Sequence, residues 1–198
     1  MARRVGRYRS YAELARHEVL GRDYRVRVSA REHSPVLIVA PHGGMIEDGT
    51  SEIALLVAAD DHNVFSFEGM KPHGANRDLH ITSHLFDHPE CMALAARCDY
   101  VLSVHGCKGA SHVHVGGLDE QFAQRLALRL TEAGFPVDER SEKYPGRHPQ
   151  NVCNRGARAQ GAQLEFTYDL RVGALRTTIA LAVRAAIADH CLKAVSPI

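Results

Sequence analysis

The sequence lacks any cysteine pattern that builds a disulfide framework or a structural zinc knuckle. Its five cysteines are an odd number, and no two of them form a Cys-x-x-Cys pair. Spacings of that kind are what identify stapled or zinc-knuckle domains in a sequence. We therefore expect reduced thiols and a cytoplasmic setting. The cysteines are Cys91, Cys98, Cys107, Cys153 and Cys191.

The sequence also lacks an excess of charge and a long apolar run. Its 24 basic and 23 acidic residues leave a formal net charge of +1, so no global field favours nucleic acid as a partner. The basic N-terminus, residues 1–9, is followed by no apolar segment, which excludes a signal peptide and a membrane span. We expect residues 1–9 to form a flexible basic arm, with neither nucleic acid nor membrane as a partner.

No internal repeat, low-complexity tract or linker divides the chain. A length of 198 residues suits a single domain with a full core, residues 1–198, and we expect a monomer. Short β-branched apolar runs alternate with helical patterns, which predicts an α/β fold with a mixed, mostly parallel sheet flanked by helices. The expected strands are 24–29, 36–41, 63–67, 100–104 and 163–168, and the expected helices are 11–20, 53–59, 89–98, 118–133 and 173–193.

Three of the expected strands carry side chains that bind metals. The run Val36–Ala40 leads into His42, Gly43 and Gly44, the next such strand ends in His105, and a third contains Glu165. Glycines allow a sharp turn and a close approach of the backbone. Because ligands of open α/β sheets bind beyond the carboxyl ends of the strands, we expect these side chains to converge.

Two histidines and two glutamates are the parts of a mononuclear zinc hydrolase. Catalytic zinc commonly takes His₂Glu and leaves a fourth position for water, whose pKa falls towards neutrality. We assign His42, Glu47 and His105 as ligands and Glu165 as the general base that passes a proton to the leaving amine. The alternatives are histidines that merely close two strands and a Glu165 that faces solvent. A cysteine hydrolase built on Cys107 or Cys153 is a further alternative.

Several segments together resemble one known family. They are APHGGMIEDGTSEIA (residues 40–54), LHITS (79–83), VHG (104–106), NVCNRG (151–156) and AQLE (162–165). The chain resembles the phage-type poly-γ-glutamate hydrolases, a zinc peptidase family with a carboxypeptidase-like α/β fold. Its ligand order is also similar to that of metallocarboxypeptidases, although these space the first two ligands as His-x-x-Glu, whereas four residues separate His42 from Glu47 here.

The resemblance implies one zinc ion and hydrolysis of the γ-glutamyl amide bonds of poly-γ-glutamate. Every unit of this polymer carries a free α-carboxylate, which arginine binds in a bidentate manner. Arg77 and Arg155 are therefore the candidate substrate-binding cations, with Asn154 as a neutral hydrogen-bond partner. Lys108 and Arg171 are weaker candidates.

Two other functions fit the same residues. A zinc deacylase of N-acyl amino acids needs the same metal site, and a non-catalytic metal- or polyanion-binding protein needs the fold but not the base Glu165. Among the remaining histidines, His80 is the best candidate for a proton donor or for a residue that hydrogen-bonds to a metal ligand. His112 and His114 alternate and would share one face of a strand, which leaves a second metal site, a position lining the site and a surface position as alternatives.

Overall fold

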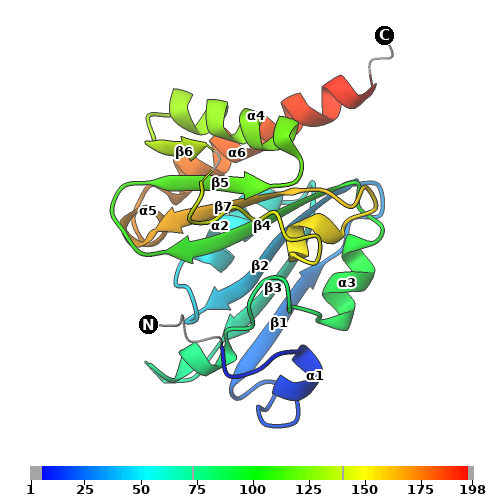
Figure 1. Ribbon diagram of the computed structural model, residues 1–198, viewed down its shortest axis with the longest axis vertical. Coiled ribbons are helices and arrows are strands. Elements are labelled where there is room, and N and C mark those ends of the chain that lie inside the picture. The colour runs from blue at the N-terminus through cyan, green and yellow to red at the C-terminus, as the bar shows by residue number, and fades with distance from the viewer. Residues whose placement is uncertain (1–5, 73, 140, 196–198) are drawn as a thin grey trace.

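A mixed sheet organises the chain. The computed structural model describes residues 6–72, 74–139 and 141–195, and within them the sheet has seven strands in the order β1-β3-β2-β4-β7-β5-β6 (Figure 1). Neighbours pair in parallel except for β1–β3 and β5–β7, so the mostly parallel α/β fold is confirmed. The strands are β1 Tyr24–Ser29, β2 Val36–Gly44, β3 Asn63–Gly69, β4 Tyr100–Cys107, β5 Val113–Gly117, β6 Val137–Glu139 and β7 Ala162–Thr167.

Helices pack on both faces of the sheet. α2, α4 and α6 pack on the first face and share one apolar cluster with β2, β4, β5 and β7. α1 and α3 pack with β1, β2 and β3 on the second face (Figure 1). The helices are α1 Tyr11–Leu14, α2 Thr50–Ala58, α3 Pro89–Ala95, α4 Glu120–Glu132, α5 Tyr168–Val172 and α6 Arg176–Val195, with 3₁₀ turns η1 Ala75–Leu79 and η2 Val152–Arg155.

The second face carries a row of polar side chains across β4, β7, β5 and β6. Side chains alternate between the two faces of a strand, and the apolar cluster under α4 and α6 takes Val104, Leu164 and Val115. Their neighbours His105, Glu165 and His114 therefore point to the opposite face. Cross-strand pairing aligns His105 with Glu165, Glu165 with His114, and His114 with Asp138. The sheet thus places four polar side chains in one line.

The N-terminal segment differs from its prediction. α1 ends at Leu14 instead of continuing to residue 20, because the buried carboxylate of Glu18 turns away to accept a 2.5 Å hydrogen bond from the Tyr8 hydroxyl and to pair with Lys71. Tyr8 is itself only 2% exposed. Of the expected basic arm, residues 1–5 lie outside the described residues, and residues 6–9 pack against the domain.

Gly43 is required by its surroundings, and Gly43→Ala is expected to destabilise the protein. An added Cβ would lie 2.2 Å from Ser51 Oγ and 2.7 Å from Ser66 Oγ, so the loop after β2 would have to move. We expect a loss of about 1–3 kcal/mol in urea unfolding together with weaker zinc binding. Gly21→Ala is the control, because an added Cβ there meets nothing within 4 Å and only the left-handed backbone (φ +86°) is strained; this variant should keep its zinc affinity. Equal zinc affinity in both variants would contradict the account.

Candidate functional site

The loop after β2 is folded back so that His42 and Glu47 meet. The pairing of β2 with β3 is irregular between Ala40 and Gly43, and Gly44 has a left-handed backbone (φ +60°). The Glu47 amide donates to the His42 carbonyl at 2.9 Å, and the Thr50 hydroxyl donates to the Glu47 carbonyl at 2.8 Å. The first turn of α2 therefore holds the loop closed, which brings together two side chains five residues apart.

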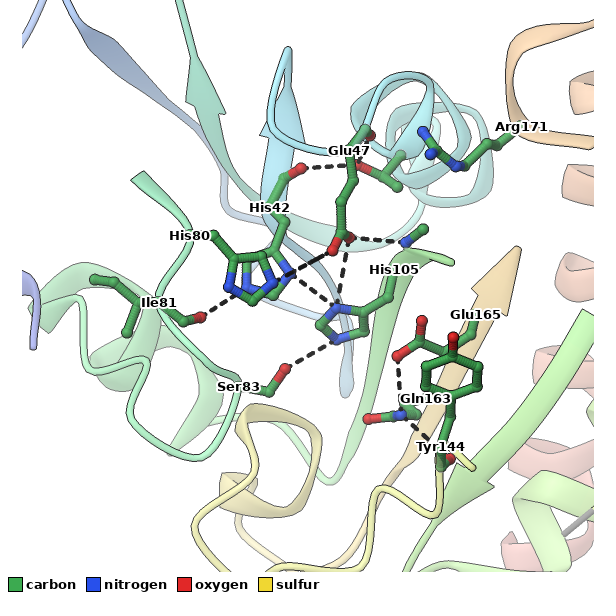
Figure 2. A network of polar contacts seen from close by, with 12 residues as sticks. His42, Glu47, His80, Ile81, Ser83, His105, Tyr144, Gln163, Glu165 and Arg171 are labelled. Atoms are coloured by element: carbon green, nitrogen blue, oxygen red, sulfur yellow. Dashed lines mark hydrogen bonds and ion pairs between the residues drawn. The ribbon is translucent and has the colours of Figure 1, made fainter. Parts of the chain in front are cut away.

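The three predicted ligands, His42, Glu47 and His105, converge at distances that suit zinc. His42 Nδ1 lies 3.1 Å from Glu47 Oε1 and 3.2 Å from His105 Nδ1, and His105 Nδ1 lies 3.8 Å from Glu47 Oε2 (Figure 2). Zinc–nitrogen bonds of about 2.0–2.1 Å in a tetrahedron separate the ligand atoms by about 3.3 Å. The donor set and its spacing therefore fit a zinc ion.

The outer nitrogens of both histidines are occupied, which leaves their inner nitrogens for the ion. His42 Nε2 lies 2.7 Å from the Ile81 carbonyl oxygen, which only accepts, so Nε2 carries a proton and Nδ1 is the nitrogen that faces the cluster. His105 Nε2 lies 3.4 Å from Ser83 Oγ. Metal-binding histidines usually have their second nitrogen fixed in this way by a carbonyl or hydroxyl. The hydrogen bonds thus orient both rings for a shared ion.

The charges of the cluster also favour a cation. Burial by itself raises the pKa of Glu47, but the neighbouring His42, His80 and His105 hold it well below its usual range. Burial and the charge of His42 lower the pKa of His105 to about 3, so this ring is neutral at neutral pH. Burial lowers the pKa of His42, and the Glu47 carboxylate more than offsets this. The cluster therefore combines an ionised carboxylate with a neutral imidazole, as metal binding requires.

His80 gives a second candidate ligand set. Ligand atoms of His42, Glu47 and His80 lie within 4.8 Å of one another, with His80 Nε2 3.5 Å from Glu47 Oε1. However, the His42 and His80 rings are stacked, 3.8 Å apart at 25°, and a ligand lone pair lies in the plane of its ring. One ion cannot lie in both of two such stacked planes. The His42 and His105 rings meet at 62°, so we favour the set with His105.

Glu165 stands one strand away from this cluster. It pairs in register with His105 across β4 and β7, and the residue is 9% exposed. Figure 2 shows its carboxylate beside the Tyr144 ring, on the neighbouring strand to His105. Gln163 Nε2 donates to Glu165 Oε1 at 3.3 Å. Glu165 therefore lies beside the cluster, on the strand next to His105.

Gln163 is held so that its amide nitrogen must face Glu165. Asn151 Nδ2 donates to Gln163 Oε1 at 2.9 Å, which fixes the orientation of the Gln163 amide. We expect Gln163→Leu to lower kcat about tenfold, because a charged hydrogen bond of this kind contributes roughly 1.5–3 kcal/mol, while zinc content and KM stay near wild type. Steady-state kinetics with metal analysis check this result. Gln150→Leu, which replaces an exposed glutamine next to Asn151, is the control and should leave kcat unchanged.

The three predicted substrate-binding residues differ in exposure and in their contacts. Arg77 is exposed on η1, and Arg155 Nη1 donates to the Phe86 carbonyl at 3.2 Å. Asn154 is 2% exposed, and backbone groups engage both of its polar atoms. Its nitrogen donates to the carbonyls of Gly146 and His148, and its oxygen accepts from the amides of Leu118 and Gly161. Asn154 and Arg155 therefore hold the loops around the site in place.

Two other cations, Arg171 and Lys143, lie near residues that contact Glu47 or Glu165. The guanidinium of Arg171 approaches Gly106, where an added Cβ would lie 2.6 Å from Arg171 Nε, and the Gly106 amide donates to Glu47 Oε2 at 2.7 Å. Arg171 also donates to the Asp48 carbonyl. The second cation, Lys143, is exposed and lies 5.1 Å from the centre of the Tyr144 ring. The only sequence signal for Arg171 is its position six residues after Glu165.

The cysteines do not have the properties of nucleophiles. Burial, with Glu165 as a further contribution, raises the pKa of Cys107 to about 11, and burial raises that of Cys153 to about 12. The thiolate is the reactive form of cysteine, so both thiols are almost fully protonated at neutral pH. The cysteine hydrolase alternative therefore has no support.

A cavity of about 260 Å³ lies elsewhere, between α4, β5 and the loop that follows β6. Among the described residues, its lining includes Glu120, Glu139, Glu142 and Arg147. Separately, within the described residues, no helix has the length and apolar character needed to span a membrane.

Comparisons with known proteins agree with this geometry. The family model described as poly-gamma-glutamate hydrolase matches residues 8–194. The SPbeta prophage-derived UPF0714 protein YoqZ of Bacillus subtilis (strain 168) is 39% identical over 139 residues, which are 69% of this chain and 50% of YoqZ. The chain thus spans about half the length of this relative.

Solved structures share the whole fold. A bacteriophage poly-gamma-glutamate hydrolase superposes with a TM-score of 0.89 at 25% identity, covering 96% of this chain and 100% of the phage chain. Zinc-free YndL superposes with a TM-score of 0.82 at 29% identity, again over 96% of this chain and 100% of the other. These matches confirm the predicted single α/β fold with its mostly parallel sheet and the predicted family. The chain belongs to the poly-γ-glutamate hydrolase family.

Proposed function

We propose that this protein is a zinc-dependent hydrolase that cleaves the γ-glutamyl amide bonds of poly-γ-glutamate. The observation that carries the proposal is the convergence of His42 Nδ1, His105 Nδ1 and the Glu47 carboxylate within 3.1–3.8 Å of one another, with Glu165 one strand away. A protein that only binds zinc needs His42, His105 and Glu47 and has no need of Glu165. A carboxylate beside the cluster adds the base that hydrolysis requires.

His42, Glu47 and His105 would hold the zinc ion. A bound zinc ion supplies Lewis acidity, which polarises a carbonyl oxygen and favours the deprotonation of water. The hydrogen bonds to the Ile81 carbonyl and to the Ser83 hydroxyl keep the two imidazoles aimed at the ion. These contacts also prevent the rings from turning towards solvent, so the ligand geometry is preorganised.

Glu165 is the group that moves the proton. Its carboxylate takes a proton from the attacking water and delivers it to the nitrogen of the departing amine. Gln163 donates to Glu165 Oε1, which fixes the orientation of the carboxylate. The step balances without a further reactant, because water supplies the hydroxyl to the acyl carbon and the proton to the amine.

The substrate class rests on the family and on the charges near the site. Poly-γ-glutamate is polyanionic. The buried Arg171 and the exposed Lys143 both lie near Cys107, because their charges lower the pKa of its thiol against the effect of burial, and Glu165 lies near the same thiol, whose pKa it raises. We extend the substrate of the phage relative to this chain on that basis. Arg77 remains a proposed contact for distant units of the polymer, since it is exposed.

Size-exclusion chromatography of poly-γ-glutamate tests the proposal against its alternatives. The polymer is incubated with metal-stripped protein and with the same protein reloaded with zinc. Shortening by the reloaded sample alone is the expected result. An unshortened polymer together with release of the amino acid from an N-acyl amino acid would identify a deacylase instead. Bound zinc without either reaction would identify a binding protein.

A further inference from the structure

The row of polar side chains continues past Glu165. His114 on β5 pairs in register with Glu165 on β7 and, on its other side, with Asp138 on β6. Directly paired residues on neighbouring strands project to the same face, about 5 Å apart. His114 therefore stands beside the proposed base, on the side away from His105.

The His114 ring is held in one orientation. Its Nδ1 lies 2.8 Å from Asp138 Oδ2 and 3.2 Å from Ser141 Oγ. The hydrogen bond from His114 keeps the pKa of Asp138 below its usual value, so the carboxylate stays an acceptor and Nδ1 carries a proton. The Tyr144 ring packs 5.1 Å from the imidazole. Nε2, on the far side of the ring from Nδ1, is the remaining polar atom of the ring, and the side chain is 13% exposed.

The distance between His114 and Glu165 suits a leaving group that carries a carboxylate next to its nitrogen. Glu165 delivers its proton to the departing nitrogen, and the metal-binding cluster lies on the β4 side, so the amine half of the substrate lies towards β5. In an α-amino acid the carboxyl carbon is about 2.5 Å from the nitrogen, and neighbouring strands are about 4.8 Å apart. A carboxylate next to the departing nitrogen therefore comes within reach of His114.

We propose that His114, fixed by Asp138 and Ser141, binds the α-carboxylate of the amino acid whose nitrogen leaves. The inference rests on the proposed function and narrows its substrate class to amides of α-amino acids. With the substrate bound, Nδ1 donates to Asp138 and Nε2 donates to the substrate carboxylate, a charge-assisted hydrogen bond. The ammonium group of Lys143 near Tyr144 adds positive charge on the same side.

Two γ-linked glutamate oligomers test the proposal. In the second oligomer one internal unit is 4-aminobutyrate, which has the same backbone as γ-linked glutamate and lacks only the α-carboxylate. Zinc-loaded wild type should cleave the bond on the amino side of this unit about tenfold to a hundredfold more slowly than the same bond in the all-glutamate oligomer. Mass spectrometry of the products gives the two rates within one experiment.

His114→Ala should lose most of this preference by slowing cleavage of the all-glutamate oligomer alone. Asp138→Asn is a second variant, which keeps a hydrogen-bond acceptor and should show a partial loss if His114→Ala fails to fold. His112→Ala is the matched control, because it removes an imidazole whose ring centre lies 5.9 Å from that of His114 and which belongs to a residue outside the row; it should keep the preference.

Equal cleavage of the two bonds by wild type, or an unchanged preference in both His114→Ala and Asp138→Asn, would overturn the carboxylate site and leave the proposed function intact. If the zinc-loaded wild type cleaves neither oligomer at any bond, the proposed function itself fails and this inference fails with it.

Discussion

Glu165→Gln is expected to bind zinc as tightly as wild type and to hydrolyse poly-γ-glutamate about 10²- to 10⁴-fold more slowly. The substitution keeps the shape of the side chain and its hydrogen bond with Gln163 but removes the group that accepts the proton, and general base catalysis contributes a factor of this size. Release of new amino termini gives the rate, and metal analysis of the same sample gives the zinc content.

The control for this variant is Glu142→Gln, which removes one negative charge from an exposed position. It should keep the wild-type rate. A Glu165→Gln protein with full activity would rule out the proposed base, and one that lost its zinc would show that Glu165 belongs to the ligand set.

His42→Ala should lose both zinc and activity. The substitution removes one of three ligands and the contact with the Ile81 carbonyl. Loss of a residue that only hydrogen-bonds to a metal ligand already lowers metal affinity about 10- to 100-fold. Because His42 is itself a proposed ligand, we expect its loss to lower zinc affinity by more than about 100-fold. Competition with a chromophoric chelator measures the affinity.

His105→Ala and His80→Ala separate the two candidate ligand sets. We expect His105→Ala to behave like His42→Ala, because its Nδ1 lies 3.2 Å from His42 Nδ1. We expect His80→Ala to keep its zinc, because the His80 ring is stacked on His42. The reverse pattern would assign the metal to His42, Glu47 and His80.

The sequence predicted the central strands well because their signals are local. Val36–Ala40 is a short run of buried residues, and its β-branched character distinguishes a strand from a helix. The observed β2, Val36–Gly44, continues through the glycines because they pair with β3 after the irregularity at Ala40. The N-terminal helix was predicted too long, because its end depends on the burial of Glu18 by distant Tyr8 and Lys71.

The ligands could be proposed from the sequence, whereas the substrate contacts could not. His42 and His105 follow strands that are neighbours in the sheet, so topology alone brings them together. Arg155 and Asn154 lie on the 3₁₀ turn η2, where the direction of a side chain depends on the loops around it. The position of Arg171 against Gly106 depends on how α5 packs, which no local pattern in the sequence encodes.

A zinc titration of the metal-free protein, with activity measured at each step, tests the central claim most directly. If His42, Glu47 and His105 form one catalytic metal site, cleavage of poly-γ-glutamate rises in proportion to added zinc and reaches its plateau at about one equivalent per chain. Cleavage by protein shown to contain no metal, or zinc binding at one equivalent without any gain in activity, would contradict the account.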